Sequence, residues 1–186
     1  MAGPENPLSA KLTAALRPAK LICGIIISEK DLISEVESLL QENFGIIDLR
    51  SLLIPFDFTD YYKSEMGENL WRQWVSFEKL IASETLPEIK LKTNALENKF
   101  SVMGKRRVNL DPGYIVLSRL VLASTKDFAH RIYLKDGIFA EVTLIYKHKE
   151  FRPLEWTYPD YRTEIAIQFF QKVREKYQKE IKDRPF

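Results

Sequence analysis

The chain has 186 residues, of which 45% are hydrophobic and 29% are charged, as in an ordinary globular protein. This length suits one domain, and such a domain buries roughly 70% of the surface that its unfolded chain exposes. Lys and Arg number 28 against 26 Asp and Glu, so the net charge is +2. That balance lacks the concentrated basic stripe typical of non-specific DNA binding, although it does not exclude nucleic acid.

The cysteine content and the apolar segments exclude several further classes. Cys23 is the single cysteine and there are two histidines, so the chain forms no intrachain disulfide and shows no zinc-ligand spacing. No apolar stretch approaches the ~20 residues that span a bilayer, and the first residues lack the apolar core of a signal peptide. We therefore expect a cytoplasmic protein with no membrane association, a flexible N-terminal tail at 1–18 and a single domain at 19–186.

The apolar periodicity predicts alternating strands and helices. Residues 20–27 form a continuous apolar run of buried-strand length, and the next apolar residues recur at helical spacing up to Gly45. Ser28 with Asp31, and Thr85 with Glu88, have the spacing of capping boxes at two helix starts. The expected elements are a strand at 20–27, a helix at 32–44, a strand at 46–58 interrupted at Pro55, a strand at 71–81, a helix at 86–100 and a strand at 106–110.

This order, β-α-β-β-α-β, predicts an α+β fold with a ferredoxin-like core, in which two helices cover one face of a mainly antiparallel sheet. The rest of the chain extends that core. Its alternation around Asp136-Gly137 predicts a C-terminal β-hairpin at 130–144. Apolar residues spaced by four predict a final helix at 165–181, which Pro185 ends. The segment 114–123 fits either a strand or a helix.

Three ionisable residues, His130, Arg131 and Glu141, lie inside the predicted hairpin. If Asp136-Gly137 is a two-residue turn, His130 and Glu141 become diagonal neighbours on one face. A carboxylate beside an imidazole fixes the tautomer of the ring, which suits a general acid or base. A three-residue loop would instead place Arg131 opposite Glu141 as a structural ion pair. Two-residue Asp-Gly turns are favoured, and the prediction that His130 and Glu141 are catalytic depends on that turn.

The stretch RRVNLDPGY, residues 106–114, supplies a second group of candidates. Asp111 begins a predicted Asp-Pro-Gly turn, because proline presets φ and glycine accepts positive φ. Asn109 and Asp111 are two residues apart on an extended strand, so their side chains point the same way. Together with Arg107 just upstream, they are predicted to bind and orient an anionic ligand such as phosphate. A solvated basic edge is the alternative.

Two further polar segments contribute ligand-binding candidates. Residues 124–127 interrupt two apolar runs and combine Lys126 with loop N–H groups, as in anion sites. Where the last helix begins, Tyr158, Asp160 and Arg162 combine an aromatic ring with two charges. A planar ligand could stack there, whereas capping of the helix is the alternative role for Asp160.

Motifs for a metal or for a nucleotide loop are weak. Asp57 and Asp60 could hold Mg²⁺, but a three-residue spacing in a loop is slight evidence, and we predict no metal site. A P-loop requires GxxxxGK[ST], in which glycines let backbone N–H groups close around the phosphates. Gly104-Lys105 has no upstream glycine at that spacing. A nucleotide would therefore bind by another arrangement.

Several long motifs are unusual enough to point to relatives. They are IPFDFTDYY (54–62), SFEKLI (76–81), IKLKTNALE (89–97), RRVNLDPGYI (106–115), LASTKDFAHRIYL (122–134), GIFAEVTL (137–144) and EWTYPDYR (155–162). Together they resemble a family of small bacterial proteins of unknown function, over about residues 19–177. Members of that family are often labelled GTP-binding proteins, so the resemblance implies GTP as a candidate ligand and implies no catalytic residue.

These features predict one function and one alternative. The first is a protein that binds, and could act on, a phosphorylated nucleotide-like small molecule such as GTP. The basic residues named above, with Arg131 added, would hold its anionic oxygens. The alternative is a non-catalytic interaction module for RNA or a protein partner, in which Trp71, Trp74 and Phe77 of the 71–81 strand stack bases. The sequence indicates no particular cofactor.

Overall fold

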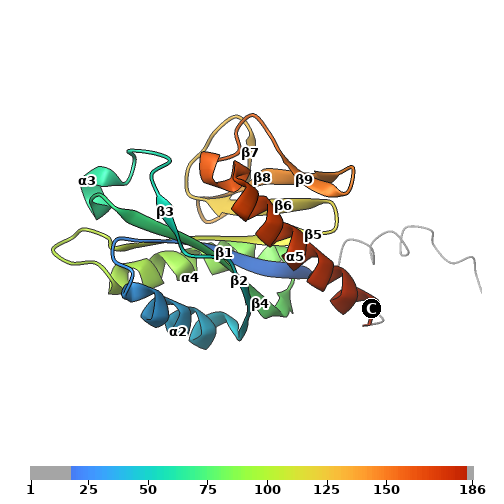
Figure 1. Cartoon of the computed structure of the whole chain (residues 1–186), viewed down its shortest axis with the longest axis horizontal. Helices are drawn as coiled ribbons and strands as arrows, with labels where there is room; N and C mark the ends of the chain where they lie inside the picture. The colour runs from blue at the N-terminus through green and yellow to red at the C-terminus, as the bar shows by residue number, and fades with distance from the viewer. Residues whose placement is uncertain (1–17, 184–186) are drawn as a thin grey trace, which may run out of the picture.

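The computed structural model describes residues 18–183 and combines helices with one open, mostly antiparallel sheet of nine strands (Figure 1). The strand order is β2-β4-β1-β5-β6-β8-β7, while β3 pairs with β4 and β9 pairs with β8. The strands are β1 (Ala19–Ile27), β2 (Ile47–Arg50), β3 (Ile54–Phe56), β4 (Leu70–Ile81), β5 (Val108–Val116), β6 (Arg119–Ser124), β7 (Arg131–Lys135), β8 (Ile138–Lys147) and β9 (Glu150–Pro153). The helices are α2 (Leu32–Phe44), α3 (Lys63–Met66), α4 (Leu86–Lys99) and α5 (Glu164–Lys182), with 3-10 turns η1 (Ser83–Thr85) and η2 (Pro159–Arg162).

Two hydrophobic clusters lie on opposite faces of the sheet. Every residue of β1 is buried, and its side chains alternate between the two faces. Leu21, Cys23 and Ile25 pack with residues of α2 and α4, whereas Ile22 packs with residues of α5. Figure 1 shows the same arrangement, with α2 and α4 on one side of β1 and α5 on the other. The predicted apolar run is therefore a central strand covered on both faces.

The predicted mixed fold with a mainly antiparallel sheet is confirmed. The undecided segment 114–123 is strand, since it forms the end of β5 and most of β6. None of the helices in the described residues is long and apolar enough to cross a membrane. The predicted tail at 1–18 lies outside the described residues apart from its last member, and Pro185 lies outside them too.

The predicted Asp-Pro-Gly turn is wrong, because residues 111–113 lie inside β5. Asp111 pairs with Gly24 and Pro112 pairs with Cys23 on the neighbouring β1. Gly113 serves a close approach instead of a turn: a Cβ added there would lie 2.3 Å from the carbonyl oxygen of Val121 on β6. The pairing of β5 with β6 begins at Gly113, so the proline, which has no N–H to donate, lies where β5 has β1 as its neighbour.

The hairpin has the predicted two-residue turn but not the predicted register. Asp136 and Gly137 have positive φ of 54° and 74°, and the residues on either side of them pair directly. A bulge at Leu134, between Tyr133 and Lys135, then shifts the ladder by one residue. The prediction that the strand pairing makes His130 and Glu141 diagonal neighbours on one face is therefore wrong, because the residue directly opposite Glu141 is Arg131.

The predicted capping boxes do not form. Before α2 the Ser28 hydroxyl has no hydrogen-bond partner among the described residues, and Asp31 makes no capping hydrogen bond. Before α4 the Thr85 hydroxyl donates to the Ala82 carbonyl and caps no N–H group. At α5 the cap is Thr163, whose hydroxyl accepts from the backbone N–H of Ala166. Capping of that helix is thus provided by Thr163, which leaves Asp160 to a different partner.

Candidate functional site

Along the first half of β5, side chains of α4 form the hydrogen bonds that backbone groups at the strand edge need. The backbone N–H of Leu110 donates to Glu97 Oε1 at 2.8 Å, and its carbonyl accepts from Lys90 Nζ at 2.7 Å. Both side chains are less than a tenth exposed. Because buried backbone groups must be paired, these two α4 residues take the place that a neighbouring strand would fill. They hold β5 and β6 apart on this side of Gly113.

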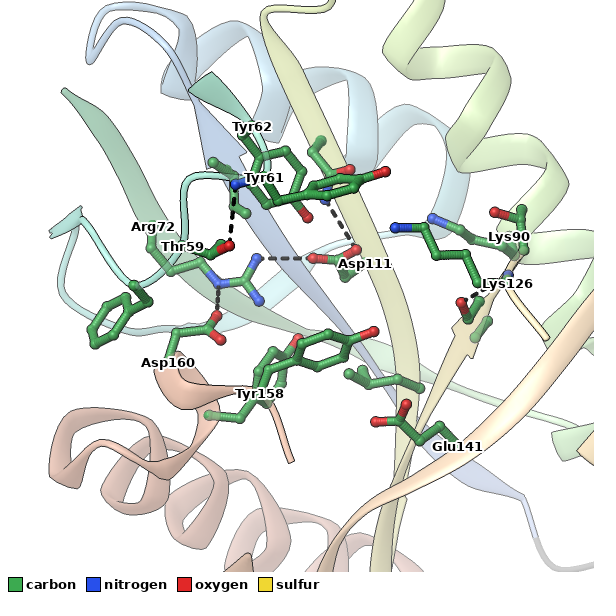
Figure 2. A pocket seen from close by; sticks show the side chains of 18 of the residues that line it. Thr59, Tyr61, Tyr62, Arg72, Lys90, Asp111, Lys126, Glu141, Tyr158 and Asp160 are labelled. Carbon is green, nitrogen blue, oxygen red and sulfur yellow. Dashed lines mark hydrogen bonds and ion pairs between the residues drawn. The ribbon is translucent and has the colours of Figure 1, made fainter. Parts of the chain in front are cut away.

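A cavity of about 690 Å³ opens beside this edge of β5. Its walls are the loop at 57–62, the loop at 125–130, the polar side of α4, and η2. Figure 2 shows side chains from these segments converging on it. Seven of the ten predicted site residues line the cavity: Asn109, Asp111, Lys126, Arg131, Glu141, Tyr158 and Asp160.

Arg72 of β4 lies at one end of the cavity and joins two carboxylates from distant parts of the chain. Its side chain is 1% exposed, with Nη1 at 3.0 Å from Asp111 Oδ2 and Nε at 2.9 Å from Asp160 Oδ2. Figure 2 shows the guanidinium between these two groups. Its carbon also lies 5.0 Å from the ring centroids of Trp74 and of Tyr161, within the range of cation–π attraction.

The two carboxylates on Arg72 differ in how readily they take up a proton. Burial alone would raise the pKa of Asp111, but the charges of Arg72 and Lys90 and the hydrogen bonds from Arg72 and Asn109 outweigh it and hold that pKa below its usual range. At Asp160 burial prevails over the attraction of Arg72, so its pKa lies above the usual range. Asp160 therefore takes up a proton at a higher pH than Asp111 does.

Arg131 and Glu141 form a second buried group, which fixes the loop at 125–130. Glu141 Oε2 accepts from Arg131 Nε at 2.8 Å, and Oε1 accepts from the Thr143 hydroxyl at 3.1 Å. Arg131 Nη1 donates to Ser124 Oγ and to the Lys126 carbonyl, both at 2.9 Å. Its Nη2 donates to the Tyr158 hydroxyl at 2.6 Å. Arg131 thus connects β8, the loop and the segment before η2.

Lys126 is the pocket cation with the least charge compensation. Its Nζ lies 3.7 Å from the ring centroid of Tyr61, across the mouth of the cavity. Within residues 18–183 it forms no ion pair with a carboxylate, whereas Arg72, Lys90, Arg106 and Arg131 each do. A charge held only by an aromatic ring is available to an anionic group that enters the cavity.

One family model covers most of the chain. Residues 17–177 match the model of a domain of unknown function, DUF4416. The chain belongs to the DUF4416 family. The resemblance to a family of unknown function is thereby confirmed. No curated protein and no solved structure matches this DUF4416 chain significantly.

Three predicted residues lie outside the cavity of this DUF4416 domain. Arg107 pairs with Glu29 at the surface, at 2.7 Å, and Arg162 donates to the backbone carbonyls of residues 154, 155 and 157. His130 approaches Glu141 with Nε2 at 3.1 Å from Oε2, so the geometry brings the predicted pair together despite the shifted register. Its ring stacks between Phe128 and Trp156. Proton transfer by His130 and Glu141 stays a prediction.

Several cavity residues were not among the predicted ones. Arg72, Lys90 and Glu97 are charged residues that are buried in the fold. Sequence periodicity could have pointed to them only by showing that a charged residue occupies a buried face. Lys90 and Glu97 are seven apart, hence on one helix face, but that face carries Ile89, Thr93 and Leu96 as well. The loop residues Tyr61 and Tyr62 had no such signal.

The remaining predictions concern metal and the aromatic strand. Asp60 pairs with Lys63 at 2.8 Å, and its side chain is 85% exposed. Among the described residues no group of three or more His, Cys, Asp or Glu could hold a metal ion. Trp74 and Phe77 are fully buried, on opposite faces of β4. The predicted stacking of bases is therefore not available on Trp74 and Phe77, and Trp71 is only partly buried.

Proposed function

We propose that this DUF4416 domain binds a small anionic molecule with a planar ring, of the size of a nucleotide, in the cavity beside β5. The observation that supports this best is the cavity itself, since 690 Å³ lies within the range of small-molecule sites. A concave site with apolar walls and a few convergent polar groups is the usual form of such a site.

The planar ring of the ligand would lie among the aromatic side chains of the cavity, and its anionic group would contact Lys126. Phe56, Phe58, Tyr61, Tyr62, Phe128 and Tyr158 all line the cavity. Aromatic walls accept a flat ring by stacking, with little dependence on which ring it is. Lys126 supplies an uncompensated positive charge at the mouth. GTP, which the family resemblance implied, fits this description, as do other nucleotides.

We infer a ferredoxin-like arrangement for the part of the chain that carries most of this site. Its support is the order β2-β4-β1-β5, with antiparallel pairing between each pair of neighbours. The helices α2 and α4, which pack on one face, make the two crossovers. This architecture hosts many functions, so it does not favour one ligand over another.

The test is thermal unfolding of the full chain with GTP, GDP, ATP, other nucleotides and sugar phosphates, each with and without Mg²⁺. A ligand at 100 times its Kd adds about 2.7 kcal/mol to the free energy of unfolding, which corresponds to a shift of a few degrees. We expect a selective shift in the wild-type protein and a smaller one in Lys126→Met.

Lys105→Met is the matched control, since Lys105 is a lysine outside the cavity beside Arg106. It should keep the wild-type shift. If no member of the panel raises the unfolding temperature, or if Lys105→Met weakens the shift as much as Lys126→Met does, the cavity is not the binding site proposed.

A further inference from the structure

Charge is distributed unevenly within the cavity. At the Arg72 end two groups of ion pairs, which Asn109 links by hydrogen bonds to Arg106 and Asp111, together contain four carboxylates and three cations. The cations are Arg72, Lys90 and Arg106, and the carboxylates are Glu65, Glu97, Asp111 and Asp160. An excess of one charge among buried side chains is screened less than it would be in water. This end therefore favours a group that donates hydrogen bonds or carries positive charge.

The opposite end has the reverse character. Arg131 and Glu141 balance one another there, and Lys126 adds a positive charge that no carboxylate in residues 18–183 compensates. In Figure 2 Lys126 enters from the side opposite Arg72, with Asp111 between them. A ligand that matched both ends would carry hydrogen-bond donors at one edge and an anionic group at the other.

Asp111 is the carboxylate of this set that a ligand can reach. Its side chain is 26% exposed, against 6% for Asp160 and 4% for Glu97. Glu65 is more exposed, but both of its oxygens accept from Arg106, and it does not line the cavity.

Asp111 also keeps free acceptor capacity. Oδ1 accepts from Asn109 Nδ2, and Oδ2 accepts from Arg72 Nη1, each at 3.0 Å. A carboxylate oxygen has two acceptor positions, so each oxygen can accept one more hydrogen bond. These two bonds also fix the direction of the carboxylate, because both partners are buried. The group is positioned before a ligand arrives.

We propose that Asp111 accepts hydrogen bonds from an amino or ring N–H edge of the ligand, and so determines specificity in this site. The ligand class is then amphoteric: a planar ring with an N–H donor edge toward Asp111 and an anionic group toward Lys126. This assignment rests on the proposed function, because it names the class of molecule that the same cavity takes. A carboxylate acceptor discriminates strongly, since a ligand without the donor would displace water from the free acceptor positions of Asp111 and leave them unfilled.

The experiment measures, by calorimetric titration of the full chain, nucleotide pairs that differ in one exocyclic amino group. The pairs are GTP with ITP, and ATP with purine riboside triphosphate. In the wild-type protein, the amino-bearing member of at least one pair should bind roughly 10- to 100-fold more tightly, the range for a hydrogen bond to a charged group. Equal affinities within both pairs would overturn the assignment, with no variant needed.

Two isosteric variants separate specificity from the ion pairs of Arg72. Asp111→Asn replaces the exposed acceptor and should abolish the preference for the amino group. Asp160→Asn is the matched control, since it removes the other carboxylate on Arg72 from a position that a ligand hardly reaches. It should keep the preference. If both variants lose the preference for the amino group equally, Asp111 acts only by supporting Arg72, and the proposal is overturned.

A second probe separates this proposal from the proposed function. Benzamidine has a planar ring and an amidinium donor edge but no anion, so it needs Asp111 and not Lys126. Its binding, followed by NMR, should persist in Lys126→Met and disappear in Asp111→Asn. If no nucleotide binds and benzamidine still binds in this way, the nucleotide-like ligand is wrong, whereas the role of Asp111 as a hydrogen-bond acceptor is supported. If benzamidine does not bind to the wild-type protein either, the acceptor role of Asp111 is wrong as well.

Discussion

At the residue scale, Arg72 occupies a position in β4 where a hydrophobic side chain would cost less. It is 1% exposed, and an alanine Cβ in place of Gly24 would lie 2.8 Å from its Nη2. Burial of a guanidinium is unfavourable unless its partners compensate it. Asp111 and Asp160 are those partners, so each member of the group depends on the others.

Arg72→Met should therefore lower the free energy of unfolding by about 3–5 kcal/mol, because it leaves the carboxylates of Asp111 and buried Asp160 without their cation. Urea denaturation measures this change. Arg50→Met is the control: Arg50 pairs with Glu37 at 2.8 Å, but its side chain is 42% exposed. Loss of such a surface pair costs at most about 1 kcal/mol. Equal losses in the two variants would contradict the role assigned to Arg72.

Local sequence motifs predicted several residues of the site, but they did not predict Arg72. Lys126 was predicted from a polar interruption of apolar runs, Asp111 from its position beside an Asp-Pro-Gly motif, and Tyr158 from a segment that combines aromatic rings with charges; all three line the cavity. Arg72 was not predicted, because alternation in the 71–81 strand assigns it a face without showing that two carboxylates meet it there. Those carboxylates are 39 and 88 residues further along the chain. Contacts at such separations leave no local pattern.

At the scale of elements, the C-terminal helix is held to the sheet by a buried ion network. Lys20 of β1 is 0% exposed, and its Nζ lies 2.6 Å from Asp48 Oδ2 and 2.7 Å from Glu180 Oε1. Ser76 of β4 donates to the other oxygen of Asp48. The network therefore joins β1, β2, β4 and α5 at one place.

This network predicts a specific loss of stability in acid. Burial alone would raise the pKa of Asp48, but hydrogen bonds from Lys20 and Ser76 and the charge of Lys20 outweigh it, so the pKa in the folded protein lies below the usual 3.8. A depressed carboxyl pKa contributes stability that is fully present above the unfolded-state value and is lost as the pH falls through the folded-state value.

Asp48→Asn should therefore be less stable than the wild-type protein by about 2 kcal/mol at pH 7, the value of a hydrogen bond to a charged group. Urea denaturation from pH 7 down to pH 3 measures the difference. It should stay constant above pH 5 and shrink below about pH 4, as the wild-type carboxylate takes up a proton. A difference that is the same at pH 3 and pH 7 would contradict the assignment.

The order and type of the main elements could be predicted, but two details of the strands could not. Hydrophobic periodicity placed β1, α2, β4, α4 and α5 close to their observed bounds. It did not reveal the bulge at Leu134, because one inserted residue leaves the composition of the strand unchanged. Asp111-Pro112-Gly113 has the composition of a turn, yet pairing with β1 along its whole length keeps it extended.

At the scale of the whole molecule, the site lies where two parts of the sheet separate. The strands β2, β4, β1 and β5 lead up to it, and β6 and β8 continue beyond it. The two parts join at Gly113 and diverge toward Leu110, where Lys90 and Glu97 occupy the edge. The cavity takes its polar groups from both parts, which explains how residues from distant segments of the chain meet in one place.

The measurement that tests the central claim most directly is NMR titration of the isotope-labelled protein with GTP and with ATP in the presence of Mg²⁺. The account predicts that amide shifts concentrate in the loops at 57–62 and 125–130, in α4 between Lys90 and Asn98, and in the first half of β5, all of which border the cavity. Shifts confined to other surfaces, such as the exposed strand β7, would contradict it, and so would the absence of shifts with both nucleotides.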